Sequence, residues 1–223
     1  MTPARIAVCV ASSGHCKTQF AMSLAALMAY FPSRPLMPEQ PEQYIGQMLV
    51  ESSSLAYNQN QLVIKAREWG ASHILWVEDD MQFPPDALHC LFARRQLWVG
   101  ANYPVRSGPP FTNTALALDK SRVVTYGHSS GLESVLYTGY GCTLMDVQLF
   151  DRVPQPWFEM SWLGDNQYAT TDWYFSEKVR AAGIPIYVDH DLSKRIGHAG
   201  AHVFNCAEVE AWLTAQKEQK HGE

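Results

Sequence analysis

Three consecutive carboxylates, Glu78, Asp79 and Asp80, come directly after the apolar residues 73–77. Carboxylates beside a buried strand need a positive charge to neutralise them, and carboxylate oxygens are ligands that hard divalent cations prefer. Glu78 and Asp80 are two residues apart, so both side chains lie on one side of an extended segment. The spacing therefore predicts a site for a divalent cation. The competing interpretation is a solvated turn that does no chemistry.

The segments that would position these acids alternate between short apolar runs and stretches with helical spacing. This alternation favours an α/β fold with a mainly parallel central sheet flanked by helices. Strands are predicted over residues 5–11, 73–77, 97–103 and 184–188. Helices are predicted over residues 18–30 and 55–69, after Pro84-Pro85-Asp86, from Asp172 to Gly183, and after Asn205, which forms an N-terminal cap with Glu208.

The C-terminal half has a different pattern. Residues 122–127 and 132–138 alternate enough to predict a hairpin or a pair of strands, and so a smaller mixed β region. In the helix that opens at Asp172, the side chains of Phe175, Val179 and Ala182 are predicted to form an inward stripe.

Composition limits the class of protein. The formal net charge of −5 at pH 7 gives no general attraction to nucleic acid or anionic lipid. The five cysteines are scattered without CxxC spacing, which predicts reduced thiols and a cytoplasmic protein. No apolar run approaches the roughly 20 residues that cross a bilayer, so no membrane span is expected.

Several short motifs follow one another in an order that resembles the GT-A glycosyltransferases, and most closely the family 2-like enzymes that use nucleotide-sugar donors. The likeness covers roughly residues 5–205 and rests on the order and spacing of motifs that are individually weak. The motifs are Asn60-Gln61-Leu62-Val63, Glu78-Asp79-Asp80, residues 139–144, Pro156-Trp157-Phe158, Asp172 and Gly197-His198.

The resemblance implies one GT-A (Rossmann-like) domain over residues 1–223. Residues 1–103 would form the half that binds the nucleotide sugar, and residues 104–205 the half that binds the acceptor and carries the catalytic residue. Residues 206–223 would form a C-terminal helix and tail.

The resemblance also implies a metal-dependent transfer of a sugar from a nucleotide-sugar donor, with a UDP-sugar favoured, to an acceptor hydroxyl. Asp80 would be the principal metal ligand, with Glu78 binding directly or through water. His198 would add a neutral nitrogen, which favours Mn²⁺ over Mg²⁺ because imidazole suits transition metals. Asp172 would be the general base, since the helix dipole favours its charged form, and the reaction would then invert the anomeric configuration. If Asp172 is not the base, a retaining outcome stays open, because this fold hosts both. The bland interpretations are a capping aspartate and a histidine that only makes a hydrogen bond.

Further roles follow from the same likeness. The donor-binding residues would be Ser12, Ser13, Asn60 and Asp79. The acceptor-binding residues would be Gly141, Trp157, Phe158 and Trp173, and for the aromatic ones the alternative is core packing.

The chain departs from the family pattern at three places. Glu78 replaces the first aspartate of the metal motif, and Thr171 precedes Asp172 where a glutamate is usual. Gln59 stands where an arginine is common, so a cationic contact to the donor would come from Lys65, Arg67 or Arg106, or be missing.

The acceptor stays open. A saccharide fits the family, and a hydroxymethylated base in DNA is the sharpest alternative, because a basic rim could follow phosphates. That rim would consist of Arg94, Arg95, Arg106, Lys120 and Arg122. The small size would suit a phage-like enzyme.

Two rival classes remain. A nucleotidyltransferase on a related α/β sheet would also use paired carboxylates and a metal, but it would be expected to carry a Gly-rich basic loop after the first strand. Here only Ser12-Ser13-Gly14 with Lys17 is present. A non-catalytic nucleotide- or carbohydrate-binding module would bind the donor without turnover.

Overall fold

The computed structural model describes residues 3–40, 42–106 and 108–221. Its strands are β1 (Arg5–Ser12), β2 (Tyr44–Glu51), β3 (His73–Val77), β4 (Met81–Gln82), β5 (Trp98–Gly100), β6 (Leu132–Val135), β7 (Cys142–Asp146), β8 (Ser161–Gly164), β9 (Gln167–Ala169), β10 (Ile186–Asp189), β11 (Gly197–Ala199) and β12 (Val203–Asn205). Its helices are α1 (Thr18–Ser33), α2 (Leu55–Glu68), α3 (Ala87–Ala93), α4 (Leu149–Arg152), α5 (Thr171–Ala181), α6 (His190–Ser193) and α7 (Cys206–His221).

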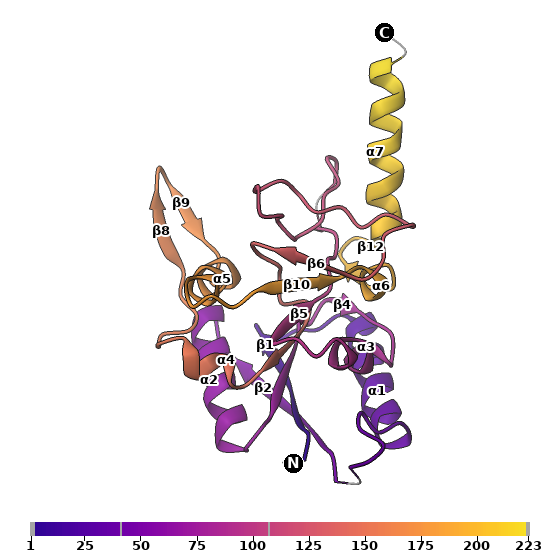
Figure 1. Ribbon diagram of the computed structural model, residues 1–223. Helices are drawn as coiled ribbons and strands as arrows, with labels where there is room; N and C mark the ends of the chain where they lie inside the picture. The colour runs from indigo at the N-terminus through magenta and orange to yellow at the C-terminus, as the bar shows by residue number, and fades with distance from the viewer. Residues whose placement is uncertain (1–2, 41, 107, 222–223) are drawn as a thin grey trace.

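A seven-stranded sheet with the order β2-β1-β3-β7-β5-β10-β6 forms the centre of the molecule. Strands β2, β1, β3, β5 and β10 run in one direction, while β7 and β6 run in the other. The sheet is therefore mainly parallel, and the predicted α/β fold is confirmed. Figure 1 shows α1 and α3 on one side of the sheet and α2, α4 and α5 on the other.

The alternation of side chains in β1 explains why both faces of the sheet are covered. Ile6 and Val8 pack with Leu27 of α1, while Ala7 and Cys9 pack with the α2 side of the core. All of these residues are buried. A strand with apolar residues on both faces needs helices on both faces, because successive side chains point in opposite directions.

The chemistry predicted for this chain depends on one edge of the sheet, which we call the carboxyl edge. Strands β1, β2, β3 and β5 all end there, at Ser12, Glu51, Val77 and Gly100. The acidic residues after β3 therefore lie beside the residues that follow β1 and β2. In open α/β sheets, ligands bind at this edge.

A second sheet, with the order β12-β11-β4, brings a remote part of the chain to the same edge. Strand β4 comes directly after the acidic residues, and it pairs with β11 so that Met81 lies opposite His198. The backbone N–H of Ala199 also donates to the carbonyl of Asp80 at 2.8 Å. This pairing places His198 beside Asp80 although they are far apart in sequence.

Several predicted elements need correction. Residues 122–127 and 132–138 do not form a hairpin with each other; β6 pairs with β10 instead, and Arg122 makes only an isolated bridge with Leu116. Edge strand β2 was not predicted, because it has polar and glycine positions and its side chains are half-buried or exposed. Ala182 is exposed, since α5 ends at Ala181 and the chain turns at Gly183 with φ +73°.

The predicted N-terminal cap of the last helix is present. The Asn205 side-chain oxygen accepts from the Glu208 N–H at 3.3 Å, and the Glu208 carboxylate accepts from the Asn205 N–H at 2.9 Å. Figure 1 shows α7 projecting away from the central sheet.

Candidate metal and donor site

Three potential metal ligands meet at the carboxyl edge. Glu78, Asp80 and His198 each offer one ligand atom, and these atoms all lie within 4.8 Å of one another. Asp80 Oδ1 is buried and has no hydrogen-bond partner among the residues that the structure describes. One imidazole and two carboxylates, one of which has an orphaned buried oxygen, are a donor set that suits a divalent transition metal. The residues present therefore fit the cation that the sequence predicts.

The hydrogen bonds of His198 decide which ring nitrogen faces the acids. Nδ1 lies 2.8 Å from the carbonyl oxygen of Pro104, which can only accept, so Nδ1 carries the proton in this contact. Nε2 lies 3.4 Å from Asp80 Oδ2. In the neutral ring, an unprotonated nitrogen then faces a carboxylate oxygen, and a cation between them removes the repulsion.

The pKa values of the two acids shift in opposite directions. Burial, together with the negative charges of Asp80 and Asp172, raises the pKa of Glu78 to about 8. Burial also opposes ionisation of Asp80, but the charge of Arg106 and, when the His198 ring is protonated on both nitrogens, the hydrogen bond and charge of that ring hold the pKa of Asp80 below the usual range. One acid is thus already compensated, while the other would gain most from an added positive charge.

The Tyr103 hydroxyl contacts the Glu78 carboxylate. Its hydroxyl lies 3.4 Å from Glu78 Oε2 and accepts from the backbone N–H of Gly141 at 2.9 Å. A Cβ at position 141 would lie 2.6 Å from the Tyr103 ring and 2.8 Å from the Met81 sulfur. Gly141 is therefore a packing requirement of the metal site, and it is buried. Its predicted contact with an acceptor has no support in this position.

Asp172 lies in the same electrostatic neighbourhood, in the first turn of α5. Its Oδ2 accepts from the Tyr137 hydroxyl at 2.7 Å, and its Oδ1 accepts from the N–H of Trp173 at 3.0 Å. Burial and the Asp172 carboxylate raise the pKa of Tyr137, so this hydroxyl stays protonated and keeps donating. Asp172 is half-buried, so its carboxylate is held by these two bonds and remains partly exposed.

A cavity of about 290 Å³ adjoins the acids, and its lining includes Ser12, Ser13, Asn58, Asp79 and Arg106. A second cavity of about 390 Å³ lies next to it and shares Ser12 and Asp79. Ser12 Oγ donates to Asp79 Oδ2 at 2.7 Å, which fixes the boundary between the two cavities. Three of the four predicted donor-binding residues therefore line one continuous region.

Asn60 does not belong to that region. Its side chain bonds to the carbonyls of Ala56 and Phe158 at 2.8 Å and accepts from the N–H of Trp157, so it joins α2 to the 157–158 segment. Asn58 takes the expected place, because two residues along a helix point to nearly opposite sides. Its amide donates to the Ser12 carbonyl at 3.1 Å.

Trp157 and Phe158 are also not available to a ligand. Their side chains are only 2% and 1% exposed and lie in the core beside Phe150 and Phe175. The Trp157 indole N–H donates to the carbonyls of Phe150 and Val153. Core packing, the alternative interpretation, is correct for this pair because both aromatic faces are covered.

Three other aromatic side chains, next to Asp172 in the sequence or in the hairpin before it, are partly or largely exposed. Trp173 is half-buried, and its ring centroid lies 5.7 Å from that of Tyr137. The hairpin formed by β8 and β9 ends three residues before Asp172 and carries Trp162 and Tyr168, which are 54% and 60% exposed. Figure 1 shows this hairpin projecting from the body of the molecule beside α5.

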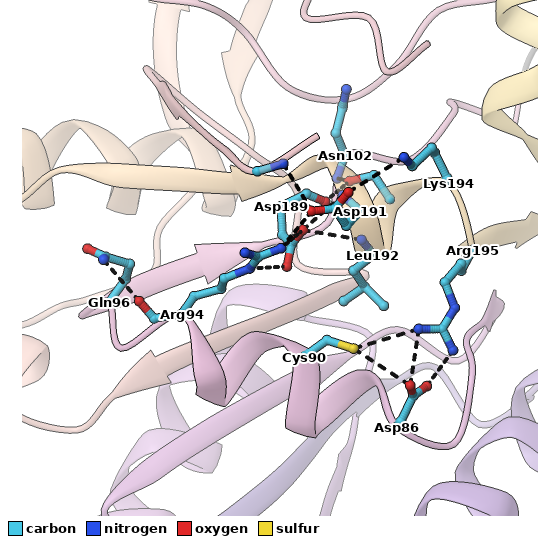
Figure 2. A network of polar contacts seen from close by, with 12 residues as sticks. Asp86, Cys90, Arg94, Gln96, Asn102, Asp189, Asp191, Leu192, Lys194 and Arg195 are labelled. Atoms are coloured by element: carbon cyan, nitrogen blue, oxygen red, sulfur yellow. Dashed lines mark hydrogen bonds and ion pairs between the residues drawn. The ribbon is translucent and has the colours of Figure 1, made fainter. Parts of the chain in front are cut away.

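Four of the five basic residues that suggested a rim make separate contacts or line a separate cavity. Arg94 binds Asp189 and Asp191 and ties α3 to α6, as Figure 2 shows. Arg95 lines a separate cavity of about 730 Å³ that also includes His73 at the opposite end of β3. Arg122 donates to the backbone carbonyls of residues 113 and 114, and Arg106 pairs with Asp80. The hypothesis of a DNA acceptor therefore has no support in these contacts.

Sequence reasoning missed the supporting side chains of the site. Tyr103 and Tyr137 each contact a predicted functional acid, and Asn58 lines the cavity beside the acids. Arg106 also lines this cavity, and it is one of the three basic residues that the sequence offered for a contact with the donor. Asn58 could be found only by weighing both sides of the predicted helix, since it lies two residues before Asn60 and points to nearly the opposite side. For Tyr103 and Tyr137 there was no signal, because their roles arise from the close approach of loops that are distant in sequence.

Solved structures provide the comparison with known proteins. The protein A197 from STIV aligns with a TM-score of 0.56 at 12% identity, over 87% of this chain and 85% of that one. GalNAc-T7, in a crystal structure with UDP, GalNAc and Mn²⁺, aligns with a TM-score of 0.55 at 9% identity, over 89% of this chain. The catalytic domain of Drosophila beta1,4galactosyltransferase 7, in complex with xylobiose, aligns with a TM-score of 0.50 at 12% identity, over 83% of this chain.

These likenesses show a GT-A-like fold and nothing finer, because all three identities are low. This chain spans 44% of the GalNAc-T7 chain and 65% of the galactosyltransferase chain. No family model matches the sequence, and no curated protein matches it. Among the described residues, none of the helices combines the length and apolar character needed to cross a membrane.

Proposed function

We propose that this protein is a metal-dependent glycosyltransferase that moves a sugar from a nucleotide-sugar donor, a UDP-sugar first, to an acceptor hydroxyl. The observation that carries the proposal is the convergence of Glu78, Asp80 and His198 within 4.8 Å at the carboxyl edge of a GT-A-like sheet. Asp172 belongs to the same neighbourhood, since its charge helps to raise the pKa of Glu78. GalNAc-T7, which shares the fold, was crystallised with UDP and Mn²⁺.

Glu78, Asp80 and His198 would hold the cation, and the imidazole favours Mn²⁺ over Mg²⁺. The negative charge that grows on the departing diphosphate would be neutralised by the bound cation. Ser12, Ser13 and Asn58 line the adjoining cavity and offer polar groups for the nucleotide.

Asp172 is the proposed general base. It takes the proton of the acceptor hydroxyl while that oxygen forms a bond to the anomeric carbon and the bond to the diphosphate oxygen breaks. Attack opposite the leaving group inverts the anomeric configuration. The Tyr137 hydroxyl holds one carboxylate oxygen of Asp172 at 2.7 Å, which fixes the direction of the other.

A saccharide acceptor is favoured over a base in DNA. Trp162 and Tyr168 expose aromatic faces on the hairpin that precedes Asp172, and aromatic rings stack on sugar rings. Residues 160–169 contain one acid and no basic residue, so the hairpin has nothing to attract a phosphate backbone. The galactosyltransferase with the same fold was crystallised with xylobiose, a saccharide.

A thermal-shift panel tests the proposal, using UDP-, GDP- and dTDP-sugars with Mn²⁺, Mg²⁺ or EDTA. We expect a stabilisation that requires both one nucleotide sugar and a metal, because ligands that bind only the folded state raise its melting temperature. Asp80→Ala should abolish this joint effect. The matched control is Asp86→Ala, which removes an acid that pairs with Arg195 away from the site.

Two results would count against the proposal. An Asp80→Ala protein that keeps the full metal-dependent shift would remove Asp80 from the metal site. Donor binding by the wild type without turnover on any saccharide would favour a non-catalytic binding module instead.

A further inference from the structure

Arg106 brings a positive charge to the candidate metal site. Its Nη1 lies 2.9 Å from Asp80 Oδ2, the same oxygen that lies 3.4 Å from His198 Nε2. The arginine charge is therefore placed against the Asp80 oxygen that faces His198, while Oδ1 has no partner among the described residues. A cation bound between Asp80 Oδ2 and His198 Nε2 would have to compete with Arg106 for that oxygen.

The backbone segment that carries Arg106 also orients His198. The carbonyl of Pro104 accepts from His198 Nδ1 at 2.8 Å, and Arg106 follows two residues later. The segment is held by backbone bonds on both sides, from the Val105 N–H to the Thr112 carbonyl and from the Thr114 N–H to the Tyr103 carbonyl. One stretch of chain thus fixes the proton of one ligand and neutralises another.

The two partners differ in how easily they can separate. The side chain of Arg106 is 48% exposed, whereas that of Asp80 is 13% exposed. Asp80 must keep a positive partner because it is largely buried, but Arg106 can turn toward solvent at low cost. Arg106 also lines the 290 Å³ cavity with Ser12 and Ser13, where a donor diphosphate would lie.

The geometry points to Arg106 as an exchangeable internal counter-ion: it neutralises Asp80 when no cation is bound, and it moves to the diphosphate of the nucleotide when the cation takes its place. The second half of this inference rests on the proposed function, while the first half concerns the metal alone. Cation binding frees the guanidinium, and the diphosphate gives it a new partner with bidentate geometry. Each ligand therefore raises the affinity for the other, and the coupling is reciprocal.

Binding titrations of Mn²⁺ alone, UDP alone and each in the presence of the other test the inference, by calorimetry and by the electron paramagnetic resonance of free Mn²⁺. Arg106→Ala should bind Mn²⁺ roughly three- to tenfold more tightly than the wild type in the absence of UDP, because the competing charge is gone. With Mn²⁺ saturating, the same variant should bind UDP roughly tenfold more weakly, because a charge-assisted contact is lost. The mutual enhancement between Mn²⁺ and UDP should shrink in proportion.

Arg122→Ala is the matched control. It removes an arginine that contacts backbone carbonyls of residues 113 and 114, on the same segment, and has no contact with Asp80. Arg122→Ala should change neither the Mn²⁺ affinity nor the UDP affinity by more than about twofold. That result would show that losing any one positive charge does not tighten Mn²⁺ binding and weaken UDP binding, as we expect for Arg106→Ala. Arg106→Gln keeps more of the side-chain length but has no charge, and it should behave as Arg106→Ala does. Agreement between the two variants would show that the effect comes from the charge and not from the shortened side chain.

The outcomes separate the two proposals. Unchanged or weaker Mn²⁺ binding by both Arg106 variants would overturn the counter-ion role while leaving the metal site in place. Absence of Mn²⁺ binding by the wild type would overturn the metal site itself, and the inference with it. Tighter Mn²⁺ binding with unaltered UDP affinity would overturn the transfer of Arg106 to the diphosphate.

Discussion

The two sides of the candidate site are held in different ways. On the metal side, the carbonyl of Asp79 accepts from Lys17 and the carbonyl of Asp80 accepts from Ala199, both at 2.8 Å, while Ser12 holds the Asp79 carboxylate. On the side proposed for the acceptor, Asp172 accepts from the Tyr137 hydroxyl and from the N–H of its neighbour Trp173, and the β8–β9 hairpin leaves its large side chains in solvent.

This difference matches what each side would have to do. A cation and a diphosphate place strict demands on ligand geometry, and fixed dipoles and charges cost no reorganisation during the reaction. An acceptor is recognised by its shape and its hydroxyls, which a projecting aromatic hairpin can meet with fewer fixed contacts. Substitutions on the metal side should therefore affect binding of the metal and donor, and substitutions on the acceptor side should affect transfer.

Asp172→Asn should give the largest effect. It tests directly whether transfer can be lost while binding of the metal and the donor is kept. The amide keeps the shape of the side chain and can still accept from Tyr137, but it cannot take a proton. We expect transfer to fall by about 10²- to 10⁴-fold with metal-dependent donor binding unchanged. Steady-state kinetics and a donor titration on the same protein measure both quantities.

Tyr137→Phe is the companion variant, because it removes the hydrogen bond to Asp172 and leaves the base in place. It should lower transfer by roughly tenfold, less than the loss of the base. Near-normal turnover by Asp172→Asn would assign the proton transfer to another group and break the division between the two sides.

His198→Ala should weaken Mn²⁺ binding by about 10- to 100-fold and reduce the preference for Mn²⁺ over Mg²⁺, because a nitrogen ligand is lost. The control is His202→Ala, since His202 is exposed and pairs with Glu208. A metal titration unchanged by the loss of His198 would return this residue to a structural role and leave the metal side with acids alone.

The same contrast explains what the sequence could predict. Glu78, Asp79 and Asp80 follow directly from a recognisable buried strand, and the β1 end that carries Ser12 must lie at the same edge of a parallel sheet. Their place in the fold therefore depends on local pattern. The supports of the site depend instead on contacts between remote segments: Pro104 with His198, Tyr103 with Gly141. No periodicity in either segment encodes such a contact.

The aromatic motif 156–158 was misinterpreted for a related reason. A Trp-Phe pair has the same sequence signature in a core as in a binding surface, and here the burial of Trp157 and Phe158 is decided by α2 and α5. The unpredicted hairpin places exposed aromatic residues a few positions later. The sequence thus predicted that aromatic residues would lie in this part of the chain, but it did not predict which of them would be exposed to solvent.

Gly141→Ala should disturb the metal side through packing alone. The new methyl group would overlap the Tyr103 ring and the Met81 sulfur, so one of these buried side chains must move. We expect a loss of about 1–3 kcal/mol in the free energy of unfolding, measured by urea denaturation. Gly127→Ala is the control, because a Cβ there meets only the Glu210 carboxylate, at 3.6 Å. Equal stability of the two variants would show that the space around Tyr103 is not tight.

Trp162→Ala should have the smallest effect, confined to the acceptor side. Loss of one exposed aromatic face should raise the KM for a saccharide acceptor by about two- to tenfold while kcat and donor binding stay the same. Tyr168→Ala should act in the same direction, because the two rings pack against each other with centroids 4.9 Å apart. Leu163→Ala is the matched control, since Leu163 is 58% exposed on the same hairpin but has no aromatic face. An equal effect of all three substitutions would mean that the hairpin contributes apolar area and not aromatic stacking, and the comparison between a geometrically strict metal side and an aromatic acceptor side would lose its second half.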